Sequence, residues 1–311
     1  MNEINYLEPD EIWKIFRVKS ESDFRDRYLL KGKFHPLVPE KIINDYKIVE
    51  RLTYYSYFDY SLLDEAFSKS TRIFEASITL KLEMSGLKKE GFESLDSKIK
   101  RLKDLCSNDL FEQWRLAKKL RNVFAHREAG ELMGIALMNA FKHNLNLINS
   151  IFLESSIILK KENILKNLLQ KSNHLLKGNF VLEYKNTKVL IYGARPFSTG
   201  IINNLGKTLW VFIPITGNKI IEKSSDFPNS LILKLENIEI SEKGLNAIDA
   251  ETNEVVRLTV TENVENVEKF NLHNIRITEI EKLSPNISLE YMTMLKQKTV
   301  KEIVNFIYDD W

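Results

Sequence analysis

Two polar side chains near the middle of the chain, Arg121 and His126, are of the types that carry out phosphodiester chemistry. A guanidinium can bind the non-bridging oxygens of a phosphate and stabilise the negative charge that develops on them. An imidazole titrates near neutral pH, so it can move a proton on a 2′-hydroxyl or on a leaving 5′-oxygen. RNA carries its own nucleophile, and the five histidines form no metal-ligand cluster in the sequence. We therefore predict neither a metal nor another cofactor.

The segment 108–126 is predicted to form the helix that positions these groups. On a helical wheel of about 100° per residue, Arg121 falls within the apolar stripe, where a charge costs free energy unless it meets an anion or an interface partner. Asn122 and His126 are four residues apart and share the neighbouring face, so their polar groups can converge. The apolar stripe consists of Leu110, Trp114, Ala117, Leu120 and Phe124.

The motif that starts at Arg121 and ends at His126, with Asn122 directly after the arginine, resembles the Arg-x4–6-His signature of HEPN domains. The upstream segment 66–77 is similar to the first long helix of that superfamily. The resemblance covers roughly residues 40–160. It implies a helical bundle that dimerises so that two Arg/His motifs face one cleft.

The same resemblance implies a metal-independent endoribonuclease that cleaves RNA through attack by the 2′-hydroxyl, of the toxin or antiviral-defence type. Arg121 and His126 would then be the catalytic pair and Asn122 a polar helper. Glu75 matches an acidic residue that orients the pair in some members. Two alternatives stay open: an inactive RNA-binding or scaffolding dimer of the same type, and a nucleotide-binding regulator whose ligand lies in the second half of the chain.

The first half of the chain has apolar residues at spacings of three and four, which predicts helices. The aromatic run 54–60 can stack bases, but it is more typical of a core or a dimer interface. The predicted helices cover 9–16, 22–30, 59–84, 94–106, 108–126 and, with a break, about 130–176.

The second half changes to alternating apolar residues between turn signals, which predicts a β-rich domain that ends in a helix over 288–308. The segment 193–200 is interpreted as a loop on the basic face. The predicted strands are 180–184, 188–192, 209–215, 231–235, 255–260 and 274–278. The predicted fold is therefore α+β, with a helical extension over 1–40, a HEPN-like antiparallel helical bundle over 41–177 and the β-rich domain over 178–311.

Composition places the chain among ordinary soluble proteins. Of its 311 residues 43% are hydrophobic and 28% charged, which excludes intrinsic disorder and collagen. The single cysteine, Cys106, cannot form an internal disulfide. No run reaches the roughly 18 apolar residues of a membrane span, and the polar N-terminus is not a signal peptide. We therefore expect a cytoplasmic protein without a membrane partner.

Charge is uneven, although the net charge is only +2. Residues 111–220 hold 16 Lys and Arg against 6 Asp and Glu, whereas residues 221–290 hold 7 against 14. A basic surface attracts polyanions, above all nucleic acid, but it can equally be a solvated surface without a partner. RNA and a second copy of the chain are the predicted partners, and the sequence leaves open whether a regulatory ligand or trigger acts at the β-rich domain.

Overall fold

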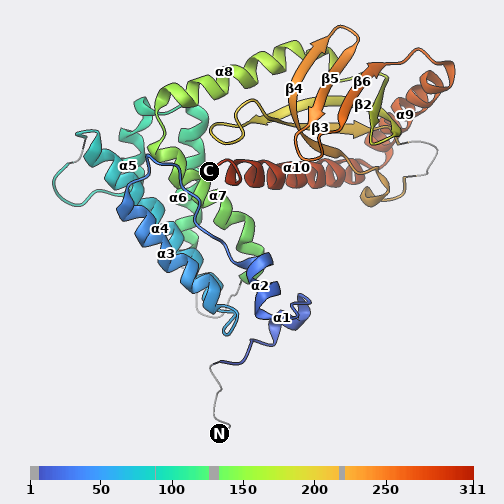
Figure 1. The fold of residues 1–311 in the computed structure, drawn as a ribbon. Helices are drawn as coiled ribbons and strands as arrows, with labels where there is room; N and C mark the ends of the chain where they lie inside the picture. Colours follow the sequence, from blue (N-terminus) through green and yellow to red (C-terminus); the bar gives the residue numbers. More distant parts are fainter. Residues whose placement is uncertain (1–6, 88, 126–132, 217–220) are drawn as a thin grey trace. The chain divides into compact units, whose positions relative to one another are not determined.

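The computed structural model describes residues 7–87, 89–125, 133–216 and 221–311, with the side chains of 123–125 left out of the description. The chain forms two compact units, residues 1–159 with Trp311 and residues 160–310 (Figure 1). The first unit is helical and the second contains the sheet, so the predicted mixture of helices and strands is confirmed. The division falls inside helix α8 (Ser155–Lys171), earlier than the expected boundary at 177/178.

The helical unit is organised around α4 (Leu62–Met84), whose apolar face is buried along its whole length. The rings of Phe67 on α4 and Phe141 on α7 lie 5.1 Å apart, and Asn144 Nδ2 donates to Ser70 Oγ at 2.6 Å. These contacts advance in the same direction along both helices, so α4 and α7 run parallel. The other elements of this unit are α1 (Ile12–Ile15), α2 (Glu21–Tyr28), α3 (Glu40–Tyr55), α5 (Leu95–Arg101), α6 (Asn108–Ala125), α7 (Met138–Phe152) and the 3-10 turns η1 (Lys103–Leu105) and η2 (Gly134–Leu137).

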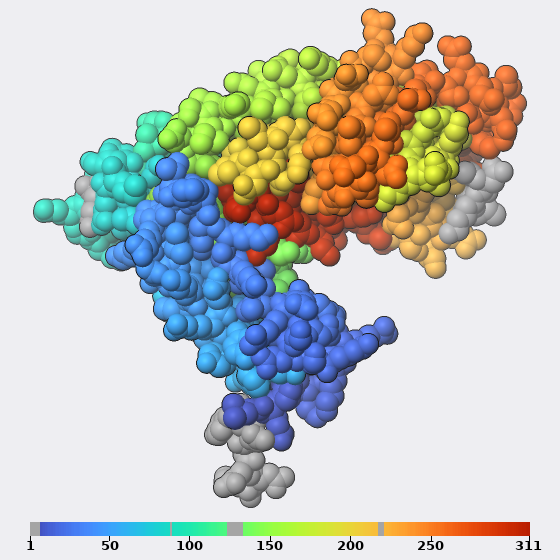
Figure 2. All heavy atoms as spheres, in the orientation of Figure 1, coloured from blue at the N-terminus to red at the C-terminus, as the bar shows by residue number. Residues whose placement is uncertain are grey.

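Helix α3 is absent from the predicted elements, although its sequence contains the signal. Its buried residues Ile42, Tyr46, Val49 and Thr53 follow the helical spacing of three and four. The part of the aromatic run after α3, residues 57–60, contributes to a second small core, which confirms that these residues pack. In the space-filling view, the dark blue residues of α1 and α2 lie against this region (Figure 2). The buried members of this core are Trp13, Phe24, Tyr57, Tyr60 and Leu63.

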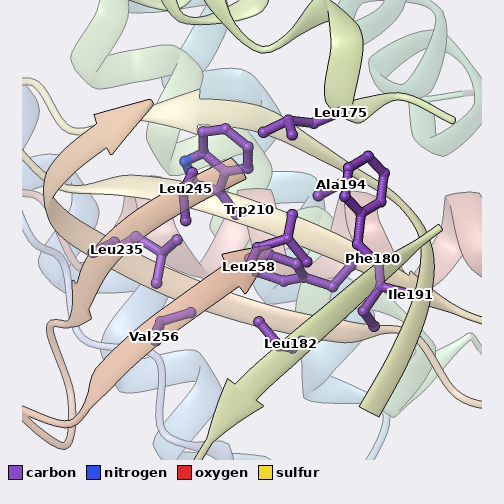
Figure 3. Close-up of a cluster of buried hydrophobic side chains, with 12 residues drawn as sticks. Leu175, Phe180, Leu182, Ile191, Ala194, Trp210, Leu235, Leu245, Val256 and Leu258 are labelled. Atoms are coloured by element: carbon purple, nitrogen blue, oxygen red, sulfur yellow. The ribbon is translucent and has the colours of Figure 1, made fainter. Parts of the chain in front are cut away.

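The second unit contains a closed antiparallel barrel in which each strand pairs with the next and β1 also pairs with β6 (Figure 1). Alternating side chains of all six strands fill its interior, where Trp210 and Phe212 are fully buried (Figure 3). Closure leaves no free sheet edge. The strands are β1 (Phe180–Tyr184), β2 (Thr187–Thr199), β3 (Thr208–Pro214), β4 (Leu231–Ser241), β5 (Gly244–Asp249) and β6 (Val255–Val260), and the 3-10 turns are η3 (Asn173–Leu175) and η4 (Ser224–Asp226).

Two predicted elements of this unit are wrong, and one strand was not predicted. The strand expected at 274–278 lies in helix α9 (Val264–Leu283), whose inward positions Phe270, His273 and Ile277 follow the helical period. The loop expected at 193–200 is mostly strand, because β2 continues to Thr199 with two register shifts. Strand β5 was not predicted, because its Asn and Ala residues have little strand preference. Its pairing with β4 and β6 stabilises it as a strand in the fold.

The chain closes with α10 (Pro285–Tyr308), which contacts β3 and confirms the predicted C-terminal helix. Just beyond it, the carboxylate of Asp310 accepts hydrogen bonds from the backbone N–H groups of Ile201, Ile202 and Asn204. The Asp310 side chain therefore holds the loop between β2 and β3 against the end of the helix.

Candidate functional site

The structure brings Glu75 and Arg121 together across the interface of α4 and α6. Arg121 Nη2 lies 2.9 Å from Glu75 Oε2, and Arg121 Nε donates to the same oxygen at 3.1 Å. Both side chains are half-buried, with 30% and 27% of their surfaces exposed. Arg121 Nη1 also lies 3.5 Å from Asn122 Oδ1, at the outer limit of a hydrogen bond. Three of the four predicted site residues thus meet at one place.

Packing of α6 fixes the position of this arginine. Leu110, Trp114 and Ala117 are buried against the bundle, and Trp114 Nε1 donates to Ser150 Oγ on α7 at 3.4 Å. Arg121 continues the same stripe one turn after Ala117, as predicted, and therefore faces α4 rather than open solvent. The α4 helix places Glu75 opposite, beside the fully buried Phe74.

Two expectations about α6 are corrected by the structure. Leu120 is 41% exposed and does not belong to the buried stripe. Arg121 finds its anion within the same chain, so its position in the stripe does not by itself require a second copy.

The fourth predicted residue, His126, lies outside the described residues. Three of the four remaining histidines make hydrogen bonds that are structural in character. Buried His35 accepts from Leu37 N–H through Nδ1 and places Nε2 2.9 Å from Asn149 O, so its neutral form with hydrogen on Nε2 satisfies both contacts. The imidazoles of His174 and His273 contact Ser241 O and Thr216. Burial lowers the pKa of His143.

A second ionic group lies beside the Glu75–Arg121 pair. Asp96 on α5 accepts from Lys118 on α6 at 2.6 Å and from Lys100 at 2.7 Å. Hydrogen bonds from Lys100 and Lys118 hold the pKa of Asp96 at about 2, so this carboxylate is ionised throughout the neutral range. Lys118 is three residues from Arg121, which places the two ionic groups on neighbouring turns of α6.

A fourth cation, Lys98 on α5, has a different kind of partner. Its Nζ donates to Thr79 Oγ1 at 3.1 Å, and that hydroxyl donates to Glu75 O at 3.0 Å. Lys98, Thr79 and Asp96 were not among the predicted site residues. The one available signal was the spacing of four between Glu75 and Thr79 on α4, because the contribution of α5 depends on how the bundle packs.

Among the described residues, no three His, Cys, Asp or Glu side chains are grouped as a metal site, and no helix has the length and apolar composition to cross a membrane. Fold and site together define a protein with a helical unit that carries a half-buried Glu–Arg pair and a unit built on a six-stranded antiparallel barrel. Comparison of the chain with protein-family models, curated proteins and solved structures finds no match.

Proposed function

We propose that the protein is a HEPN-type, metal-independent endoribonuclease whose active site contains Arg121, Asn122, His126 and Glu75, and that it acts as a toxin or antiviral-defence effector. The helical unit resembles that superfamily through the motif that begins with Arg121 on α6 and through the long helix α4. The proposal rests on the residue types in the motif and on one geometric observation, the way in which Glu75 holds Arg121.

Glu75 engages only one edge of the guanidinium. Its Oε2 accepts from Nε and Nη2 of Arg121, which leaves the edge formed by Nη1 and the second hydrogen of Nη2 without a carboxylate partner. Two parallel donors on that edge suit two oxygens of a phosphate. Glu75 thus orients a half-exposed arginine and leaves this edge, where Nη1 has the 3.5 Å contact with Asn122 Oδ1, free of a carboxylate.

The proposed reaction uses the 2′-hydroxyl of the substrate as nucleophile. The 2′-oxygen attacks the adjacent phosphorus and loses its proton, while the bond to the 5′-oxygen breaks and that oxygen gains a proton. His126 moves protons in this step, and Arg121 stabilises the charge on the non-bridging oxygens. The products are a 2′,3′-cyclic phosphate and a 5′-hydroxyl, and Asn122 helps to hold the phosphate beside Arg121.

We further propose a homodimer through the helical unit, with α6 at the interface. Leu116 and Leu120 are 55% and 41% exposed and are four residues apart, so they form an outward apolar stripe on the helix that carries the motif. A second copy seated on this stripe would bring two motifs to one cleft.

One observation favours the alternative, an inactive RNA-binding or scaffolding dimer. The Glu75–Arg121 pair links α4 to α6 and neutralises the arginine, so it accounts for both residues without a substrate. Half-exposed pairs of this kind contribute about 0–1 kcal/mol to the free energy of unfolding, so a purely structural pair would stabilise the fold only modestly.

Incubation of the purified chain with total cellular RNA in EDTA separates the two functions. The ribonuclease predicts fragments that end in a 2′,3′-cyclic or 3′-phosphate, and it predicts that His126→Ala abolishes them. The exposed His174, whose contact is with Ser241 on the barrel, provides the control: His174→Ala should cleave like the wild type. Intact RNA in every reaction would favour the inactive dimer.

A further inference from the structure

The cations around Arg121 are not all neutralised. Arg121 pairs with Glu75, and Lys100 and Lys118 share the single carboxylate of Asp96. Lys98 on α5 contacts α4 through Thr79, one turn from Glu75. The cluster formed by these side chains therefore has four cations (Arg121, Lys98, Lys100 and Lys118) and two carboxylates (Glu75 and Asp96). An unmatched charge of this sign on a partly exposed surface attracts anions.

Lys98 differs from its neighbours in having a neutral partner. Its ammonium donates to a hydroxyl, which fixes its direction without compensating its charge, and no described carboxylate pairs with it. The hydroxyl belongs to Thr79, one helical turn from Glu75 on α4. The ammonium and the guanidinium are therefore held by side chains that are one turn apart on α4.

We propose that Lys98 binds a backbone phosphate of single-stranded RNA next to the phosphate held by Arg121. The proposal rests on the proposed ribonuclease site and extends it by a subsite. Successive phosphates of a single strand can engage two cations that protrude from neighbouring elements, here α5 and α6. Lys98 does not contact the reacting atoms in this arrangement, so its role is binding.

Salt dependence of binding tests this role directly. The probe is a 2′-O-methylated RNA of roughly twelve nucleotides, which cannot supply the nucleophile, titrated by fluorescence anisotropy over a series of salt concentrations. Each lost phosphate contact to a single strand lowers the magnitude of the negative slope of log K against log salt by about 0.7. Lys98→Gln should show this decrease and bind about fivefold more weakly at 0.1 M salt, whereas Lys98→Arg should keep the wild-type slope.

The matched control is Lys47→Gln. Lys47 also has a neutral partner, since its Nζ donates to Asn44 Oδ1 at 2.8 Å, but it lies on α3. The Lys47→Gln variant should leave the slope of log K against log salt unchanged. An unchanged slope in Lys98→Gln, an equal decrease in Lys47→Gln, or no binding of the probe by the wild type would overturn the proposal.

The cleavage assay decides the proposed function separately. RNA binding that depends on Lys98 without cleavage would retain the subsite and reject the ribonuclease. Cleavage that depends on His126, combined with an unchanged salt slope in Lys98→Gln, would retain the ribonuclease and reject the subsite.

Discussion

Glu75 on α4 accepts two hydrogen bonds from Arg121 on α6 through a single carboxylate oxygen, at 2.9 Å and 3.1 Å. The pair joins two helices that are separated by α5 along the chain. It fixes the plane of the guanidinium and so determines which of its donors remain for a substrate.

Arg121→Lys tests the need for a planar guanidinium. A lysine keeps the charge, but it lacks the planar fork that can hold two phosphate oxygens with parallel donors. We expect cleavage to fall on the order of a hundredfold or more, as when one preorganised donor is lost. Single-turnover cleavage rates provide the measurement, and near wild-type rates would contradict a catalytic role for Arg121.

Glu75→Gln tests the orienting role of the carboxylate. The amide oxygen can still accept from the charged Arg121, but the attraction between opposite charges is lost, and we expect cleavage to fall about tenfold. Stability should change little, because both side chains are half-exposed. A double-mutant cycle of Glu75→Gln with Arg121→Gln, followed by urea unfolding, should give a coupling free energy of about 0.2–1 kcal/mol. A coupling of several kcal/mol would indicate that the pair is chiefly structural.

His126 is expected to set the pH dependence of cleavage. Its ordinary pKa lies near neutrality, so the rate should change between about pH 5 and pH 8, and His126→Ala should lose about 10²–10⁴-fold. The variant should still bind the 2′-O-methylated RNA, because the cations of α5 and α6 are unchanged. An active variant with the wild-type pH profile would remove His126 from the mechanism.

Leu116→Glu tests the proposed dimer. A charge in the centre of an apolar interface is left without water or a partner, so the variant should be monomeric at micromolar concentration while the wild type is a dimer. Light scattering after size-exclusion chromatography measures both. Ile48→Glu on α3, where the side chain is 42% exposed, is the matched control and should remain dimeric. A monomeric wild type would refute the dimer.

His273 on α9 makes the second unit sensitive to acid. Burial, together with the cations Lys177 and Arg276, lowers the pKa of this imidazole to about 4, and Thr216 N–H donates to its Nδ1. The folded form therefore stays neutral while the unfolded chain, with an ordinary pKa of about 6.5, gains a proton as the pH falls. As the pH falls from about 7 to about 5, His273 should therefore lower the free energy of unfolding by roughly 2 kcal/mol.

His273→Asn isolates this contribution. The asparagine oxygen can accept from Thr216 N–H but does not titrate, so the variant should lose about 2 kcal/mol less than the wild type over the same pH interval in urea unfolding. Equal losses in the two proteins would show that His273 does not remain neutral in the fold.

Local patterns in the sequence were sufficient for several elements. The strands Phe180–Tyr184 and Val255–Val260 have the predicted bounds, and the helix that carries Arg121 begins at Asn108 as expected. Such elements are predictable because their apolar residues repeat with the period of the structure they form. By contrast, Ile275 and Ile277 alternate as in a strand but lie in α9, where the helical turns on either side and the burial of His273 favour a helix.

Periodicity along the chain was enough to predict the change from helices to strands near its middle, and the motif supplied the residue types of the candidate site. Three features became visible only in the folded chain: Glu75 engages one edge of Arg121, Leu120 is exposed, and Lys98 contacts α4 through Thr79. Periodicity depends on neighbours along one helix, whereas these contacts join α4, α5 and α6, whose packing depends on all the side chains between them.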